Sequence, residues 1–318
     1  MTFRWGILST GNMANSMAAA MEHVPDAQLI AVASRTQNSA DQFAKRWGCE
    51  HAYDHFESLL ANPDIDIVYI ATPNAIHKDN ILKALEFGKH VLCEKPLTTS
   101  VEDLELCMGT ARSKGLFLME AIWTAFFPVM RKISSLVSEA AIGKIQHINA
   151  QFVSYRDPHQ SPNLFDPKLG GGATSDLGIY PIAISQLFAG AITNHSAQTV
   201  TGTSGVEEMV VISAQHENEI LSTLSYGFRA EMPILMTIAG NEGVIEIPQN
   251  FHKPDNFALS FNGNEQRFEL PPIGNGYAHE ILEVHDCIQN GRLESSVLPL
   301  SFSLRCARIL DLVRTQSQ

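Results

Sequence analysis

The chain has 318 residues, of which 45% are apolar and 18% are charged, and its formal net charge is −12. This length predicts about two domains with a substantial core. An acidic chain without a cluster of Lys or Arg excludes nucleic acid and anionic membrane surfaces as expected partners. A small anionic cofactor stays possible, because it needs only local donors.

The five cysteines, at 49, 93, 107, 287 and 306, are widely spaced and match neither a zinc site nor a disulfide framework. We therefore expect a reducing compartment and a cytoplasmic protein. The opening MTFRWGILSTG lacks the basic head and apolar body of a signal peptide. The longest apolar stretch, LFLMEAIWTAFFPVM, is interrupted by Glu120 and is too short to cross a bilayer.

Up to about residue 120, strand patterns alternate with helix patterns. The strand-like runs are RWGIL, QLIAVAS, DIVYIAT, KHVLCE and LFLME, and helices are expected at 12–23, 39–47, 77–87 and 100–114. Ser100 and Gly115 supply the start and stop signals of the last of these helices. Runs that are apolar throughout predict strands buried on both faces, and hence a parallel sheet with helices on each side.

Beyond about residue 145 the pattern changes to strands of period two. The runs are QHINAQFVSY, EMVVISAQ, EILSTLSYGF, MTIAGNEGVIEI and FALSFNG, and helices are expected at about 175–189, 276–291 and 300–316. One face of each run is more polar, which predicts an antiparallel sheet with a single covered side. The sequence thus predicts an α/β protein with a parallel-sheet domain over residues 1–122. A second, α+β domain with a mostly antiparallel sheet follows over residues 123–318.

The first loop, GILSTGNMANS, joins the first strand to the first helix. A dinucleotide-binding fold places its glycine-rich turn here, with the pyrophosphate on main-chain N–H groups of the helix N-terminus. The fingerprint G-x-G-x-x-G/A falls on Ser9, Thr10, Gly11, Asn12, Met13 and Ala14. Gly11 permits close approach of the phosphates, whereas Ser9 replaces the first glycine. We predict that residues 9–13 bind the cofactor, and an ordinary strand–helix turn stays open as an alternative.

The second strand ends in Ser34, Arg35 and Thr36, where an NAD site usually has a carboxylate for the ribose. A carboxylate would repel a 2′-phosphate, whereas a guanidinium offers it a bidentate partner. We therefore predict NADP as the cofactor, bound in part by Ser34 and Arg35. An arginine stacked on the adenine ring would also accept NAD, and this interpretation stays open.

Two further loops follow buried strands, at the carboxyl edge of the sheet where ligands bind in open α/β folds. One contains TPNAIH and the other Glu94-Lys95-Pro96. A lone histidine in the first would usually be a surface residue. The residues predicted to bind the cofactor at this edge are Thr72, Pro73, Asn74, His77, Glu94 and Lys95. In the second half, LGGGATSDLGIYPI places Asp176 and Tyr180 four residues apart, on one helical face.

Together and in this order, these motifs resemble those of the Gfo/Idh/MocA oxidoreductases, and the resemblance covers nearly the whole chain. The fold that it implies is a dinucleotide-binding Rossmann domain over residues 1–122 and an α+β domain with a large, mostly antiparallel open sheet over residues 123–318. Glu-Lys-Pro is similar to the hallmark of the family, whose lysine is catalytic or orienting, and Asp176-x-x-x-Tyr180 is similar to its second motif. Tyr180, RWGILSTG, LCEKP and FLMEAIWT-FFP look most like the dimeric dihydrodiol dehydrogenase branch. That branch uses NADP and oxidises trans-dihydrodiols and some sugars. Ala125 stands where that branch would have Arg, which leaves the exact substrate open.

The resemblance implies hydride transfer between NADP, or NAD, and a secondary alcohol or carbonyl of a sugar, cyclic polyol or trans-dihydrodiol. We assign Tyr180 as acid/base, with Lys95 lowering its pKa and holding the substrate hydroxyl; the reverse assignment stays open. Asp176 would orient the substrate or Lys95. Glu94 and Pro96 would fix the direction of the lysine, with the Lys95–Pro96 bond a candidate cis peptide. By resemblance, Trp123 and Phe152 would form the walls of the substrate pocket, and the C-terminal sheet would form a homodimer.

Three rival interpretations are weighed against this one. A non-catalytic NAD(P)-binding sensor or regulator on the same fold would be expected to lose the proton-handling lysine, which this chain keeps. HEILEVH suggests a metal, but His279 and His285 are six apart and do not share a helical face, so no metal is expected. A methyltransferase would want an acid at the end of the second strand, where Ser34 and Arg35 lie.

Overall fold

The computed structural model of the protein describes residues 2–316. By its internal contacts the chain divides into two compact units, each made of two separate stretches of sequence. Unit 1 takes the chain up to residue 123 together with residues 273–304, and unit 2 takes residues 124–272 together with residue 305 onward. The functional boundary that we place after residue 122 stays a prediction.

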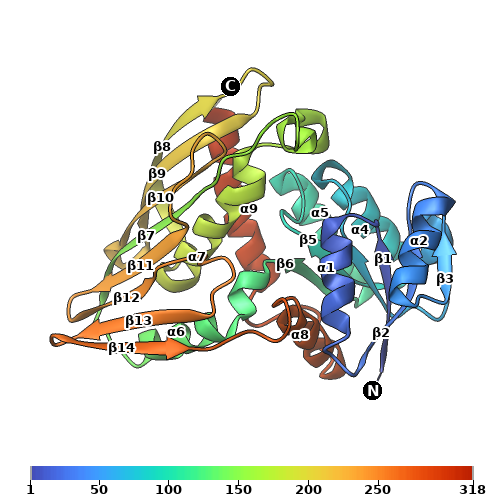
Figure 1. The fold of residues 1–318 in the computed structure, drawn as a ribbon, viewed down its shortest axis with the longest axis horizontal. Coiled ribbons are helices and arrows are strands. Elements are labelled where there is room, and N and C mark those ends of the chain that lie inside the picture. The colour runs from blue at the N-terminus through green and yellow to red at the C-terminus, as the bar shows by residue number, and fades with distance from the viewer. Residues whose placement is uncertain (1, 317–318) are drawn as a thin grey trace. The chain divides into compact units, whose positions relative to one another are not determined.

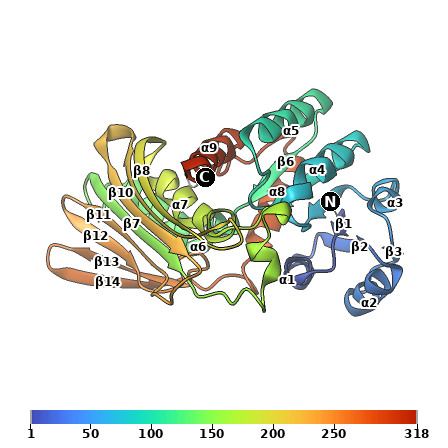
Figure 2. The ribbon, with the colours of Figure 1, turned by 90° about the horizontal axis from the view of Figure 1, so that it is seen from above.

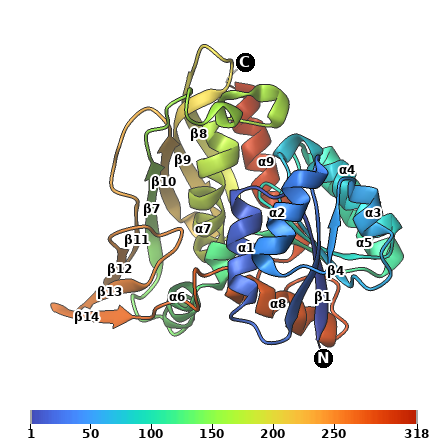
Figure 3. The same ribbon diagram turned by 45° about the vertical axis from the view of Figure 1, so that its right-hand side comes forward.

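Unit 1 is built on a six-stranded sheet with the order β3-β2-β1-β4-β5-β6, and its strands β1 and β4 are labelled in Figure 3. The strands are β1 (Phe3–Leu8), β2 (Ala27–Ala33), β3 (His51–Tyr53), β4 (Ile67–Ile70), β5 (His90–Glu94) and β6 (Leu118–Ala121). All neighbouring strands run parallel. The order reverses between β1 and β4, so the carboxyl ends of these strands form the crevice where a Rossmann fold binds its dinucleotide. The predicted Rossmann architecture is confirmed.

The helices of unit 1 cover both faces of this sheet. They are α1 (Asn12–Met21), α2 (Gln37–Trp47), α3 (Phe56–Leu60), α4 (His77–Glu86), α5 (Val101–Lys114) and α8 (Ala278–Gln289). Helix α4 packs beside α5, and α1 packs beside α8. The predicted signals of α5 are confirmed, since the Ser100 hydroxyl accepts a hydrogen bond from the main-chain N–H of Asp103 and Gly115 ends the helix with a φ of 65°.

Helix α8 completes unit 1 although it lies about 160 residues beyond β6. The indole Nε1 of Trp5, which is fully buried in β1, donates to Nε2 of His285 over 3.0 Å. The ring of Phe3 stacks on the same imidazole at 4.2 Å. Because Nε2 accepts this bond, the imidazole is neutral and carries its proton on Nδ1.

The neutral state of His285 makes the stability of the fold sensitive to acid. Burial lowers the pKa of His285 to about 4, whereas an unfolded histidine titrates near about 6.5. The stabilisation is therefore complete above pH about 6.5, and on the order of 3 kcal/mol is lost as the pH falls towards the folded pKa. We expect His285→Gln to flatten this decline, measured as the free energy of unfolding in urea between these pH values. His55→Gln, at an exposed histidine, is the control, and parallel declines in the two variants would contradict the assignment.

Unit 2 is built on an eight-stranded sheet with the order β14-β13-β12-β11-β7-β10-β9-β8 (Figure 1). Its strands are β7 (Ile145–Val153), β8 (Ile192–Thr201), β9 (Glu207–His216), β10 (Leu221–Gly227), β11 (Leu235–Gly240), β12 (Gly243–Ile247), β13 (Asn256–Phe261) and β14 (Asn264–Glu269). Strands β7 and β10 pair in parallel, and the other neighbours pair antiparallel. The prediction of a mostly antiparallel sheet is confirmed.

The helices of unit 2 lie on one side of its sheet (Figure 2). They are α6 (Pro128–Ser138), α7 (Ile179–Ala189) and the part of α9 (Leu300–Gln316) from residue 305 onward. Helix α7 packs on β7 and β10, and the side-chain amide of Gln186 reaches the Cys306 thiol of α9 over 3.4 Å. Among the residues that the structure describes, no helix of unit 2 covers the opposite face of the sheet. The single covered side was predicted from the alternation of polar and apolar residues.

Candidate active site

The loop after β1 is held by its own side chains. Ser9 has a φ of 117°, a conformation that favours glycine, and its hydroxyl accepts a hydrogen bond from the main-chain N–H of Gly11 over 3.1 Å. The amide of Asn15 donates to the carbonyl oxygens of Thr10 and Gly11 over 3.1 and 2.8 Å. Ser9 therefore occupies the position of the first fingerprint glycine and fixes the turn by its hydroxyl.

This loop fits the pyrophosphate of a dinucleotide. Helix α1 begins after Gly11 without a side-chain cap, so its first N–H groups are available to an anion. A Cβ atom placed on Gly11 would meet only the Ser9 hydroxyl, at 3.4 Å, which shows open space beside the turn. The Thr10 and Ser34 hydroxyls lie 3.3 Å apart and join this loop to the end of β2, where Arg35 is exposed.

The loop after β5 is fixed around Lys95 by buried carboxylates. The peptide bond between Lys95 and Pro96 is cis. Glu94 accepts the main-chain N–H of Lys95 on Oε2 over 3.3 Å, and Glu120 of β6 accepts the N–H of Leu97 on Oε1 over 2.9 Å. Glu94 and Glu120 are 7% and 3% exposed. The backbone on both sides of the lysine is thus held by side chains from two neighbouring strands.

His77 joins the loop after β4 to the Lys95 loop. Its ring is fully buried, with Nδ1 2.9 Å from the carbonyl oxygen of Pro96 and Nε2 2.8 Å from that of Thr72. The Thr72 hydroxyl in turn accepts from the amide of Asn80 over 3.0 Å. Burial lowers the pKa of His77, although both carbonyls favour its protonated form. The structure gives His77 a bridging position between two loops, and its predicted contact with the cofactor stays a prediction.

Tyr69 and Glu280 complete the surroundings of Glu94, and sequence reasoning missed both. The Tyr69 hydroxyl donates to Oε1 of Glu94. Glu280 of α8 is fully buried, and burial together with the charge of Glu94 raises its pKa well above the ordinary range. Neither residue belongs to a recognisable motif: Tyr69 stands within an apolar strand, and Glu280 resembles an ordinary acid in the first turn of a helix.

An aromatic pair in unit 1 connects two predicted site residues. Trp123 stacks on Tyr277 with ring centroids 4.3 Å apart and planes inclined by 26°. The Tyr277 hydroxyl lies 3.7 Å from the sulfur of Met13 in the cofactor loop. Tyr277, which the sequence did not single out, thus bridges a residue predicted for the substrate pocket and one predicted for the cofactor.

In unit 2, Asp176 and Tyr180 are neighbours along an irregular helix. Asp176 lies in a π-helical turn, Thr174–Gly178, and Tyr180 lies in α7 directly after it. The helix around Asp176 is therefore π-helical where the sequence suggested a regular helix, and the shared face of Asp176 and Tyr180 stays a prediction. The turn packs tightly, because a Cβ atom on Gly178 would lie 2.7 Å from the ring of Tyr226. π-helical turns of this kind are frequent at functional sites.

Tyr180 belongs to an aromatic cluster with Phe152 and His252. The Phe152 ring lies 5.5 Å from that of Tyr180 and stacks on His252 at 4.4 Å, and the Tyr180 and His252 rings are 5.8 Å apart. The Thr124 hydroxyl donates to the carbonyl oxygen of His252 over 2.5 Å. The structure thus brings Tyr180 and Phe152 together and adds His252, which belongs to none of the sequence motifs; the predicted contacts with the substrate stay a prediction.

Comparison with known proteins decides the family. A model described as an oxidoreductase family with an NAD-binding Rossmann fold matches residues 3–122, and one described as a GFO/IDH/MocA C-terminal domain matches residues 130–246. The trans-1,2-dihydrobenzene-1,2-diol dehydrogenase of Xenopus tropicalis is 33% identical over 323 residues, with 98% of this chain and 97% of that protein covered. The chain belongs to the Gfo/Idh/MocA oxidoreductase family.

Other Gfo/Idh/MocA-like proteins extend this comparison. The trans-1,2-dihydrobenzene-1,2-diol dehydrogenase of Homo sapiens is 30% identical, with 99% of this chain and 96% of that protein covered. A 3-ketoreductase from Actinomadura kijaniata, solved with NADP and TDP-benzene, has a TM-score of 0.89 at 28% identity and covers 99% of this chain and 98% of its own. A levoglucosan dehydrogenase solved with NADH and levoglucosan shares the fold, with a TM-score of 0.91 at 21% identity.

As a Gfo/Idh/MocA protein, the chain is an NAD(P)-dependent oxidoreductase, and the predicted family, fold class and cofactor type are confirmed.

All five cysteines are free thiols. Both histidines of HEILEVH are hydrogen-bonded within the protein. His285 accepts from the indole N–H of Trp5, and His279 accepts from the main-chain N–H of Ile273 over 3.0 Å. Between residues 2 and 316, we find no group of three or more His, Cys, Asp and Glu side chains suited to a metal. None of the helices in this range combines the length and apolarity that crossing a bilayer requires.

Proposed function

We propose that this enzyme transfers a hydride between NADP and a secondary alcohol or carbonyl of a sugar, a cyclic polyol or a trans-dihydrodiol. The observation that carries the proposal is the Lys95 loop, whose backbone is clamped by Glu94, His77 and Glu120 at the carboxyl edge of the parallel sheet. The names of the relatives, dihydrodiol dehydrogenases and a 3-ketoreductase, support the substrate class. Steady-state assays of NADP(H) turnover with sugars, cyclic polyols and trans-dihydrodiols test it, and no turnover in any of them would favour a non-catalytic sensor.

The bound nicotinamide supplies the hydride donor or acceptor. The protein must then manage the proton of the substrate oxygen, and we assign this to Tyr180 with Lys95. A phenol loses its proton more readily beside a cation, so the ammonium of Lys95 would lower the pKa of the Tyr180 hydroxyl. The same ammonium would hold the substrate oxygen. Asp176 would orient the substrate or Lys95. The pH profiles of Lys95→Met and Tyr180→Phe distinguish this assignment from the reverse one, in which Lys95 is the acid/base.

The substrate pocket has aromatic walls in this proposal. Trp123, supported by Tyr277, and Phe152, supported by His252, would contact the substrate with flat apolar faces. Such faces suit the carbon skeleton of a ring, whether of a cyclic polyol or of a dihydrodiol. The polar atoms of the site would then select the oxygen that reacts.

The proposed NADP preference depends on Arg35, which is exposed at the end of β2. We expect Arg35→Asp to reverse the cofactor preference, because the variant loses a charged partner of the 2′-phosphate and gains a group that repels it. The ratio of kcat/KM with NADP to that with NAD should fall by at least about tenfold, which corresponds to about 1.4 kcal/mol. Lys45→Asp, at an exposed lysine of α2, makes the same change of charge and serves as the control. An unchanged ratio in Arg35→Asp would assign the guanidinium to another role.

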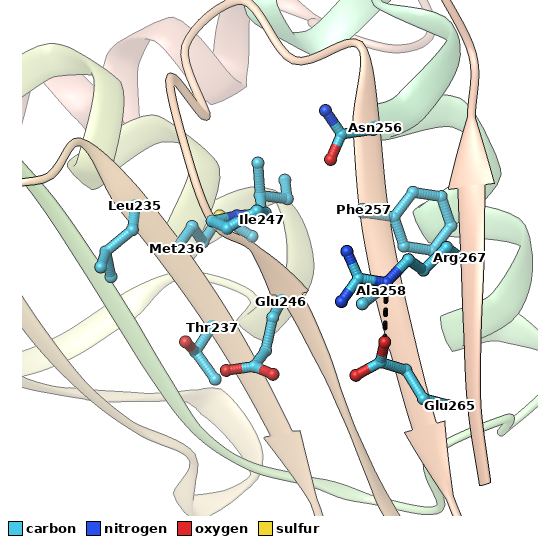
Figure 4. A pocket seen from close by; sticks show the side chains of 11 residues that line it. Leu235, Met236, Thr237, Glu246, Ile247, Asn256, Phe257, Ala258, Glu265 and Arg267 are labelled. Carbon is cyan, nitrogen blue, oxygen red and sulfur yellow. Dashed lines mark hydrogen bonds and ion pairs between the residues drawn. The ribbon is translucent and has the colours of Figure 1, made fainter.

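The open face of the unit 2 sheet supports the proposed homodimer. Val211 and Leu221 point to this face and are 42% and 53% exposed. Further along the sheet, a shallow groove of about 260 Å³ is lined by Leu235, Thr237 and other side chains, with the Arg267–Glu265 ion pair at its side (Figure 4). Exposed apolar side chains on a sheet face that no helix covers are typical of a surface that a second copy covers.

We expect a dimer mass by light scattering and a monomer mass for Val211→Arg, because this change places a charge within the proposed interface. Leu106→Arg is a matched control, since Leu106 is also 53% exposed but lies on α5 in unit 1. A monomer mass for the wild type, or equal effects of the two substitutions, would place the interface elsewhere or remove it.

We further propose that the enzyme works in the cytoplasm. Five free thiols suit a reducing compartment. A net charge of −12 disfavours nucleic acid and anionic membrane surfaces as partners.

A further inference from the structure

The most unusual group outside the proposed chemistry is the carboxyl of Glu280. The side chain is fully buried, and neither carboxyl oxygen has a hydrogen-bond partner among the described residues. An ionised carboxylate without partners is strongly disfavoured in such a place, so the group holds its proton. Glu280 is thus a neutral acid inside the enzyme.

The neighbouring acid, Glu94, is in the opposite situation. The parallel register pairs Tyr69 with Leu92, so Tyr69 and Glu94 point to the same face of the sheet as Trp5, which contacts α8. Glu94 accepts the Tyr69 hydroxyl on Oε1 and the N–H of Lys95 on Oε2. Donors to both oxygens stabilise the ionised form. Burial and the nearby acid raise the pKa of Tyr69 well above its usual range, so the phenol stays a donor.

The two acids behave as a pair. Burial raises the pKa of Glu280 first, and the charge of Glu94 raises it further. Two acids that repel each other in a buried site share protons, and the pair takes up the second negative charge only at much higher pH. A single negative charge on the two acids is therefore favoured, and the donors to Glu94 favour its location on Glu94.

We propose that Tyr69, Glu94 and Glu280 form a buried unit with one negative charge, that Tyr69 places this charge on Glu94, and that the charge so placed maintains the ammonium form of Lys95. Tyr69 and Glu280 are positioning residues, since they act on Lys95 through Glu94. This inference rests on the proposed role of Lys95 in the reaction.

The other titratable groups around the unit leave this assignment intact. Tyr277, directly before α8, is a phenol that interacts electrostatically with Tyr69. Glu120, on the opposite face of the sheet, and His77, under the loop, both interact with Lys95. Burial raises the pKa of Glu120 and lowers that of His77, so both tend to the neutral form. Of the acids that unit 1 brings to this place, Glu94 is the one with donors on both oxygens.

Infrared spectroscopy of the purified protein locates the proton without any need for turnover. The spectrum of the wild type minus that of Glu280→Gln should contain the C=O stretch of a protonated carboxylic acid at neutral pH. The difference for Glu283→Gln, one turn further along α8 and half-exposed, should lack it. A carboxylate band in the Glu280→Gln difference would mean that Glu280 is ionised and would overturn the proposal.

The action on Lys95 is tested by the pH profile of kcat/KM in a double-variant cycle. Tyr69→Phe removes the donor from Glu94 and lets the charge move to Glu280, so the limb assigned to Lys95 should shift down by about one pH unit. Adding Glu280→Gln removes that alternative place for the charge and should return the limb towards the wild-type position. Equal shifts in Tyr69→Phe and in the double variant would overturn the proposal. A wild type without turnover would refute the proposed function instead, and the infrared result would still decide where the proton lies.

Discussion

Replacing Lys95 by Met is expected to lower kcat by about 10³-fold, a much larger effect than any weakening of NADP binding. The variant keeps an unbranched side chain of similar length but loses the cation that would hold the substrate oxygen and stabilise a phenolate. The clamps on the loop engage main-chain atoms of residues 95–97, so they survive the substitution. Stopped-assay or spectrophotometric turnover gives kcat, and fluorescence titration with NADPH gives the binding constant.

Lys78→Met is the matched control for this experiment. Lys78 lies on α4 next to His77, and its ammonium forms surface ion pairs with Asp79 and Asp103. Exposed ion pairs of this kind contribute little to stability, so turnover should stay within about twofold of the wild type. A Lys95→Met enzyme that retains wild-type turnover would remove the lysine from the proposed chemistry.

Tyr180→Phe is expected to lower kcat by about 10²- to 10³-fold and to remove one limb of the pH profile. The substitution deletes a single hydroxyl and keeps the ring that packs on Phe152 and His252, so the fold should be unaffected. The profile also separates the two assignments of the acid/base. If the limb persists in Tyr180→Phe and disappears in Lys95→Met, the lysine is the proton-transferring group and the tyrosine only holds the substrate.

Tyr155→Phe provides the comparison for the tyrosine, because Tyr155 lies in unit 2 and is 55% exposed. Its loss of a hydroxyl should leave kcat and the pH profile unchanged. Near-ultraviolet circular dichroism checks that both variants keep the packing of their aromatic side chains. Wild-type turnover in Tyr180→Phe with intact cofactor binding would show that the hydroxyl takes no part in proton transfer.

The sequence was informative where local pattern and tertiary role agree. The buried strands of unit 1 are apolar throughout, and Ser100 and Gly115 mark a helix by side-chain and backbone preferences that act locally. Strands β8 and β14 were missed, because ITNHSAQTVT and NEQRFE lack the alternation of apolar residues that reveals a half-buried strand. Strand β8 pairs with β9, and strand β14 pairs with β13. Their conformation therefore depends on the partner strands rather than on their own sequences. Strand β3 has only three residues and leaves almost no pattern.

The residues of the site also differ in whether a local sequence pattern reveals them. Lys95, Asp176 and Tyr180 stand in motifs that a family resemblance exposes. Glu280 does not, because its burial is decided by the packing of α8 against strands that precede it by about 190 residues. The π-helical turn around Asp176 was not predicted either, and its Gly178 packs against the ring of Tyr226, a tertiary contact that leaves no local pattern.

The discontinuity of unit 1 has a consequence for how the chain reaches its native state. A ribosome that has released residues 1–123 has produced every strand of the parallel sheet but not α8, which supplies the partner of Trp5 and the acid beside Glu94. Nascent domains usually fold in the order of their synthesis, yet here the first must wait for nearly the whole chain. A fragment that stops after β6 lacks the hydrogen-bond partner of the buried Trp5 indole. Unit 1 is therefore completed only after the whole of the unit 2 sheet has been synthesised.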